Sequence, residues 1–242
     1  GIALVAFGVA FLSFNLSGGY KRWRGVNNLT DVEDEVDVSL GGVKVNENKV
    51  NFNSKNEKDI KRRTVDEEKI ETLDKIEDIN IENSMADINI ITENRKNMKV
   101  YYHGSISAKS IPELKIKKAG NKLNISVKNK DNDFSNVKYS DLKLDIFIPS
   151  EYKNNICVES HSGDTNVSNI VLKRLNIISH AGNISVDRIS ADNIKVSSHA
   201  GDMKMRDVKG NIEAKSSAGD TIIYFDDLND DVGIRSSAGD IE

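Results

Sequence analysis

One short phrase recurs through the second half of the chain, and no other feature limits the possible folds as strongly. It reads Ser, His or Ser, a small residue, Gly, and Asp or Asn, as in SHAGD at 198–202. The glycines of its five copies are Gly163, Gly182, Gly201, Gly219 and Gly239. Their spacings of 19, 19, 18 and 20 residues give a period near twenty, which is typical of units that stack on one another.

Aligning the copies on their glycines shows four mainly apolar columns, two and four residues after the glycine and five and seven residues before it. Alternate apolar positions predict two short strands per copy, joined at a corner where Gly supplies the backbone angles. The members are Thr165, Ile184, Met203, Thr221 and Ile241; Val167, Val186, Met205 and Ile223; Val158, Ile177, Val196, Ala214 and Ile234; and Ile156, Leu175, Ile194, Ile212 and Val232.

Two further columns hold small residues, which we expect where a tight corner leaves little room. A unit of this kind cannot bury its apolar face alone, so consecutive units must stack. We therefore predict an all-β fold, a β-solenoid like a single-stranded β-helix, with coils of 18–20 residues about 4.8 Å apart. A β-sandwich is the alternative, but it does not require a fixed period. The small columns are Ser160, Ser179, Ser198, Ser216 and Ser236, and Ser162, Ala181, Ala200, Ala218 and Ala238.

The chain opens with the uncharged, mostly apolar stretch GIALVAFGVAFLSFNLS. As a helix it would span roughly 25 Å, slightly less than the roughly 30 Å hydrocarbon core of a bilayer. We predict a transmembrane helix or signal anchor over 1–18, truncated at its start because residue 1 is Gly. A cleaved signal peptide and a buried core helix are the alternatives, although no Ala-x-Ala cleavage site follows. The basic residues of KRWR at 21–24 favour a cytoplasmic flank, and the sequence leaves the orientation open.

Residues 19–75 are polar, and we predict a linker with a weak hairpin. Valine and leucine alternate with polar residues on both sides of Gly41-Gly42, as a hairpin requires. The charge-dense stretch from 54 to 75 has no sustained run of one sign, which predicts a linker or a short exposed helix. Strand-like alternation begins near residue 76, so 76–242 is the predicted solenoid domain. It is truncated at its end, because Glu242 falls within a repeat.

These features resemble the putative adhesin family of bacterial proteins, a domain of unknown function built of β-strand repeats. The resemblance covers about residues 70–242. It rests on INIENSMADINI, on DLKLDIFIPS and on the five Gly corners. It implies a β-repeat fold and no known catalytic residues. Members commonly follow an N-terminal membrane anchor in the cell envelope, so the resemblance implies a single-pass cell-membrane protein with its repeats outside the cytoplasm.

The column two residues before each glycine holds His161, His180 and His199, followed by Ser217 and Ser237. Three outward histidines on stacked coils are a candidate zinc or copper site. The first and third would stand roughly 9.5 Å apart at the backbone, and no carboxylate lies in their column. We therefore expect a polar surface ladder that holds no metal.

The column after each glycine is acidic or amidic, which makes it a candidate calcium site. Glycine- and aspartate-rich β-rolls bind calcium with several such residues in every nonapeptide, whereas here each coil has one Asp or Asn. We expect these side chains to bond to nearby backbone instead. The residues are Asp164, Asn183, Asp202, Asp220 and Asp240.

The remaining chemistry in the sequence is sparse. No nucleophile elbow, phosphate-binding loop, His-Glu-x-x-His or cysteine pair occurs, and the single Cys157 is predicted to be inert beside inward-facing residues. The net charge of −4 gives no reason to expect nucleic acid.

We therefore expect no cofactor and no enzyme, but a non-catalytic, membrane-anchored β-repeat protein that acts as a surface interaction or adhesin-like module. Its expected partners are the membrane, through residues 1–18, and an envelope protein or polysaccharide. The alternative is a carbohydrate-active enzyme on a β-helix scaffold, which would need a concave groove with converging carboxylates.

Overall fold

The chain divides into two units, Gly1–Asp59 and Ile60–Glu242. In the first unit, β1 (Val43–Asn46) pairs antiparallel with β2 (Lys49–Phe52). The predicted membrane helix over 1–18 and the predicted turn at Gly41-Gly42 lie outside the described residues. Within the described part of the chain, no helix has the length and apolar character needed to cross a membrane. The computed structural model describes residues 43–46, 49–52, 61–129, 137–224 and 231–242.

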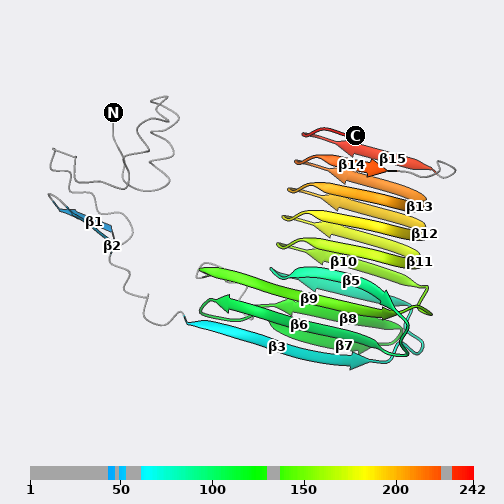
Figure 1. Ribbon diagram of the computed structural model, residues 1–242, viewed down its shortest axis with the longest axis horizontal. Helices are drawn as coiled ribbons and strands as arrows, with labels where there is room; N and C mark the ends of the chain where they lie inside the picture. The colour runs from blue at the N-terminus through cyan, green and yellow to red at the C-terminus, as the bar shows by residue number, and fades with distance from the viewer. Residues whose placement is uncertain (1–42, 47–48, 53–60, 130–136, 225–230) are drawn as a thin grey trace. The chain divides into compact units, whose positions relative to one another are not determined.

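The described residues of the second unit form strands joined by turns and bends (Figure 1). Its thirteen described strands make one sheet. They are β3 (Arg62–Glu71), β4 (Asp78–Asn83), β5 (Asp87–Glu93), β6 (Met98–Ser107), β7 (Glu113–Ala119), β8 (Lys122–Lys128), β9 (Tyr139–Pro149), β10 (Asn155–Ser160), β11 (Thr165–Ser179), β12 (Ile184–Ser198), β13 (Met203–Ser216), β14 (Thr221–Tyr224) and β15 (Val232–Ser236).

From β10 onwards the chain winds in coils that stack in parallel, which Figure 1 shows as successive rungs. Ile156 lies opposite Leu175, and Leu175 lies opposite Ile194, so each strand pairs with its own equivalent in the next coil. These side chains are buried, and the same column continues below them through Ile79 of β4. The predicted all-β, solenoid-like fold is confirmed.

Each regular coil has three short sides where the repeat predicted two strands. In β11 the pairing with β12 covers 165–168, 170–172 and 174–179, with bends between them. The first bend has a positive φ of 56° at Asn169. At each bend, the alternation of inward and outward side chains shifts by one residue. The column seven residues after the glycine therefore points inward and is buried, which the sequence prediction did not include. Its members are Ile170, Ile189 and Val208.

The small columns divide between the inside and the outside of the corner. Ser160, Ser179, Ser198 and Ser216 are buried, as a tight corner requires. The neighbouring Ser162 and its alanine equivalents are exposed instead. Their small size is therefore not imposed by the core.

The start of the stack is built differently from the regular coils. The corner between β4 and β5 lies against the first regular corner, because β4 pairs with β10 and β5 pairs with β11. β8 and β9 pair in parallel with β4 and β5 in turn. Antiparallel strands then finish both edges. At one edge β7 pairs with β8, and at the other β6 pairs with β9 and β3 pairs with β6. In Figure 1, β3 lies at the opposite end of the stack from β15.

The prediction of a linker or an exposed helix is wrong for Arg62–Glu71, which is strand β3. Ten backbone pairs join it to β6, from Arg62 opposite Ser107 to Glu71 opposite Met98. Half-buried Val65 packs against the core from this strand. The charges that resemble a solvated segment lie on an edge strand, where charged side chains discourage pairing with another chain.

Candidate functional site

The repeat glycines turn the same corner on successive coils. Their φ angles lie between +96° and +119°, a range that side-chain-bearing residues rarely adopt. A Cβ on Gly201 would lie 2.3 Å from the carbonyl oxygen of Gly182 in the coil before it. The corner therefore requires Gly both for its backbone angle and for the close approach of the neighbouring coil.

The Asp and Asn column after each glycine ties one corner to the next. The Oδ1 of Asp164 accepts the backbone N–H of Asn183 at 2.8 Å, and the Oδ1 of Asn183 accepts that of Asp202 at 2.9 Å. The same bond joins Asp202 to Asp220, and Asp220 to Asp240. One side-chain oxygen of Asp164, Asn183, Asp202 and Asp220 thus accepts a hydrogen bond from the backbone of the next coil.

The histidine column forms a stack on the outer side of this corner. The ring centroids of His161 and His180 are 4.9 Å apart, and those of His180 and His199 are also 4.9 Å apart. A carboxylate joins them from the neighbouring column, because Glu159 Oε1 lies 3.6 Å from His180 Nε2. No carboxylate lies in the histidine column itself, but Glu159 reaches it from the column two residues earlier. Sequence reasoning missed this carboxylate, although the alternation along the strand places the Glu159 side chain on the outer face, like that of His161.

A second polar feature crosses the outer face of the side that contains β5. His103 Nε2 lies 2.8 Å from Asp145 Oδ2, and Asn89 Nδ2 donates to Asp145 Oδ1 at 2.7 Å. Asn166 Nδ2 then donates to Asn89 Oδ1 at 3.1 Å. We call these four residues the polar row. They come from β6, β9, β5 and β11, which are consecutive neighbours in the sheet.

The polar row is fixed in place by the strands that carry it and by one aromatic ring. The Tyr101 ring stacks on His103 with centroids 4.2 Å apart, and its hydroxyl donates to Asp66 of β3 at 2.9 Å. Asn89 lies between the buried Ile88 and Ile90, so its side chain must point outward. Sequence reasoning missed the row, because its members are separated along the chain and meet only through sheet pairing.

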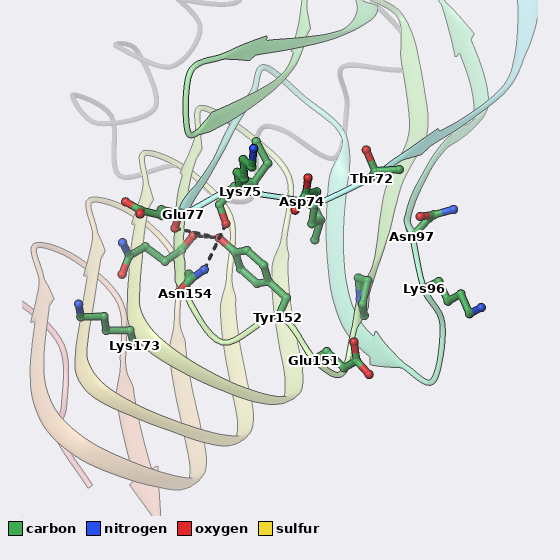
Figure 2. Close-up of a pocket in the computed structure, with 14 residues that line it drawn as sticks. Thr72, Asp74, Lys75, Glu77, Lys96, Asn97, Glu151, Tyr152, Asn154 and Lys173 are labelled. Atoms are coloured by element: carbon green, nitrogen blue, oxygen red, sulfur yellow. Dashed lines mark hydrogen bonds between the residues drawn. The ribbon is translucent and has the colours of Figure 1, made fainter.

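A hollow of about 740 Å³ lies where β4 and β10 begin (Figure 2). The Tyr152 hydroxyl lies within it, 2.8 Å from the carbonyl oxygen of Asn155 and 3.0 Å from that of Glu77. Burial raises the pKa of this phenol well above its ordinary value. In Figure 2 the carboxylates of Glu77 and Glu151 point away from one another, and Asn121 Nδ2 donates to Glu77 at 2.7 Å. Glu77 and Glu151 therefore do not form an acid–base pair across the hollow.

Cys157 is half-buried on the outer face of β10. Asn176 Nδ2 of the next coil lies 3.4 Å from its sulfur. The thiol thus takes part in a contact between two coils.

Comparison with known proteins matches most of the chain to one family. The family described as Toastrack DUF4097 matches residues 76–242. A crystal structure of a putative cell adhesion protein from Clostridium sporogenes is similar, with 17% identity and a TM-score of 0.56 over 74% of this chain and 98% of that one. A putative adhesin from Bacteroides fragilis has 14% identity and a TM-score of 0.39 over 75% of this chain and 96% of that one. No curated protein matches the chain.

Proposed function

The chain belongs to the Toastrack DUF4097 family, as its resemblance to the putative adhesin family predicted, and we propose that it is a non-catalytic surface interaction module of a bacterial cell envelope. In this proposal residues 1–18 anchor it in the cell membrane as a single pass, and the repeats of 76–242 stand outside the cytoplasm. The apolar character of the first residues supports the anchor.

The polar row is the observation that carries this proposal. Its amide, carboxylate and imidazole groups are held by strands and by one another before any partner arrives. Groups fixed in advance lose little conformational freedom on binding. A repeat stack also offers a long regular face, which suits a large partner better than a small ligand. The partner in this proposal is an envelope polysaccharide or an envelope protein.

A matched pair of substitutions tests the row as a binding surface. Asn166→Arg places a long cation on the row, and Val171→Arg places the same group at an exposed position on another side of the same coil. We expect the chain to bind isolated envelope polysaccharide or purified envelope proteins. Asn166→Arg should weaken that binding by about tenfold or more, and Val171→Arg should change it little. Equal loss in both variants would remove the row from the proposal.

The non-catalytic part is tested in the same incubations by measuring new reducing ends. A release of reducing ends that His103→Ala abolishes would replace the interaction module with the carbohydrate-active enzyme. In that enzyme His103 and Asp145, 2.8 Å apart, would be the acid–base pair.

The location is tested by protease treatment of intact cells whose wall has been permeabilised. We expect residues after about 25 to be digested while a cytoplasmic marker protein stays intact. Full protection of the repeats would place them in the cytoplasm, in agreement with the basic residues at 21–24.

A further inference from the structure

Two imidazoles and one carboxylate meet at the outer edge of the first regular corner. The ligand atoms of Glu159, His161 and His180 all lie within 4.8 Å of one another. Of these atoms, His180 Nε2 and Glu159 Oε1 lie 3.6 Å apart. Both of these side chains are more than two fifths exposed, so their torsions can adjust without disturbing the core.

The backbone positions of this cluster are fixed by the stack. The N–H of His161 donates to the carbonyl oxygen of Asn83 at 2.9 Å, and the N–H of His180 donates to that of Ser160 at 2.9 Å. Glu159 and His161 flank the buried Ser160, so both point outward from the same strand end. The two histidines belong to adjacent coils, about 4.8 Å apart at the backbone. The roughly 9.5 Å separation of the first and third histidines therefore does not limit this site.

The stack provides this donor set at one level only. In register with Glu159, the following coils carry Ile178, Ser197, Lys215 and Arg235. The preceding coil carries Glu82 in that column, and this carboxylate forms an ion pair with Lys128. Its neighbour in the histidine column is Ser84. A carboxylate and two histidines thus coincide only between β10 and β11 in the described coils.

We propose that Glu159, His161 and His180 form a zinc site on the outer corner of the stack. Two His and one Glu are a ligand set that proteins use for Zn²⁺ when a fourth position is kept open. Bonds of about 2.0–2.1 Å require ligand atoms ~3.3 Å apart in a tetrahedron. Exposed side chains that now lie within 4.8 Å reach this spacing by small rotations. Water or a group from a binding partner fills the fourth position.

His199 supplies a matched control, because it shares the column and the exposure of the two ligands but not their role. Its ring stacks on His180 at 14° between planes, and its Nδ1 lies 3.4 Å from the carbonyl oxygen of Ser179. It packs against the ligand ring and lies outside the cluster of three. The proposal is independent of the function proposed above, since it concerns a different face of the coils.

The test is a zinc titration of the full chain purified without a polyhistidine tag, with bound metal measured by equilibrium dialysis. We expect one Zn²⁺ per chain, and weakening by about tenfold or more in Glu159→Gln, His161→Ala and His180→Ala. His199→Ala should stay within about twofold of the unmodified chain. Equal zinc-free melting temperatures of all variants show that an altered affinity is not a loss of fold.

Proton NMR of the four histidines gives a second readout. Zinc should shift the ring resonances of His161 and His180 and leave those of His103 in place, because His103 pairs with Asp145 on another side of the stack. Two results would overturn the proposal. One is no zinc binding tighter than about 1 mM, and the other is the same loss of affinity in His199→Ala as in His180→Ala.

Discussion

In the regular coils each strand pairs with the strand that follows it by about one repeat, whereas at the start of the stack β4 pairs with β10 across 77 residues, from Asp78 to Asn155. Both regions bury the same columns, since Ile79 and Ile156 lie in register and are equally inaccessible. The repeat therefore makes contacts that are local in sequence. The start of the stack makes the same contacts through long-range pairing and closes its end with antiparallel strands.

The corners show the same contrast at the level of single residues. In a regular corner, the buried Ser198 donates to the carbonyl oxygen of Gly201 at 3.2 Å. At the start of the stack, Asn83 occupies the serine column and Ala86 occupies the glycine position. Asn83 donates to the carbonyl oxygen of Ala86 at 2.7 Å and accepts its N–H at 3.0 Å. At this first corner the side-chain amide of Asn83 therefore stabilises the turn, whereas in the regular corners the turn depends on the backbone conformation of Gly.

The largest expected effect comes from breaking a regular corner with Gly201→Val. The added Cβ would meet the backbone of Gly182 at 2.3 Å, and the φ of +119° is strained for a β-branched residue. We expect a loss of roughly 4 kcal/mol or more in the free energy of unfolding. Urea denaturation followed by circular dichroism measures it.

Gly120→Val is the control for that prediction, because Gly120 also has a positive φ of +61° but has no atom within 4 Å of an added Cβ. We expect it to cost about 1–2 kcal/mol from backbone strain alone. Similar losses in the two variants would mean that the close stacking of adjacent corners contributes nothing.

The next effect compares the two corner devices directly. Asn83→Ala should cost about 2–4 kcal/mol, because it removes a buried amide and leaves the Ala86 N–H without its acceptor. Ser198→Ala should cost about 1 kcal/mol, since it removes one hydroxyl bond at 3.2 Å. The difference in urea midpoints checks the comparison. A larger loss for Ser198→Ala would show that the regular corners depend on their side chains more than the first corner does.

The difference between the regular coils and the start of the stack also explains which parts of the fold could be predicted from the sequence. The columns around the glycines were identified because their period is fixed and their alternation is intact on each side of the corner. Ile170, Ile189 and Val208 were missed, because the positive φ at Asn169 and its equivalents shifts the alternation by one residue. The antiparallel end was missed for another reason. Its strands pair once, with distant partners, and charged β3 has the composition of a linker.

The candidate sites follow the same rule. The histidine column and the Asp column lie within the repeat, so the sequence alone predicted that the members of each column lie next to one another on successive coils. Glu159 joins the histidines through register between adjacent coils, which alignment on one column does not show. The polar row depends on β6 and β9. Because these strands lie outside the repeat, its period does not predict their order in the sheet. Local repetition therefore predicts the ladders of the regular coils and the neighbours they meet there, whereas the polar row can be predicted only from the long-range pairing of β6 and β9.

The smallest expected effect concerns ion pairing between regular coils at their first bend. Arg206 Nε donates to Asp187 Oδ1 at 2.7 Å, from one coil to the next. This bond holds the pKa of Asp187 below its ordinary value of 3.8. Burial acts in the opposite direction, and the charges of Arg188 and Arg206 lower the pKa further. A carboxyl whose pKa is lowered by folding stabilises the protein above its unfolded pKa, and this stability is lost as the pH falls through the folded pKa.

Asp187→Asn should therefore lower the melting temperature at pH 7, but only by about 2 °C or less, because the Arg206 side chain is about half exposed and solvent screens the pair. The difference from the unmodified chain should shrink once the pH falls below about 4 and vanish at still lower pH. Asp192→Asn, a substitution at an exposed position on the same strand, is the control. It should leave the melting temperature unchanged at pH 7 and at acid pH. A difference that grows on acidification would reverse the sign of the linkage and exclude Arg206 as its cause. In that event the regular coils would be held together by their corners and buried columns alone, without help from charge at the bend.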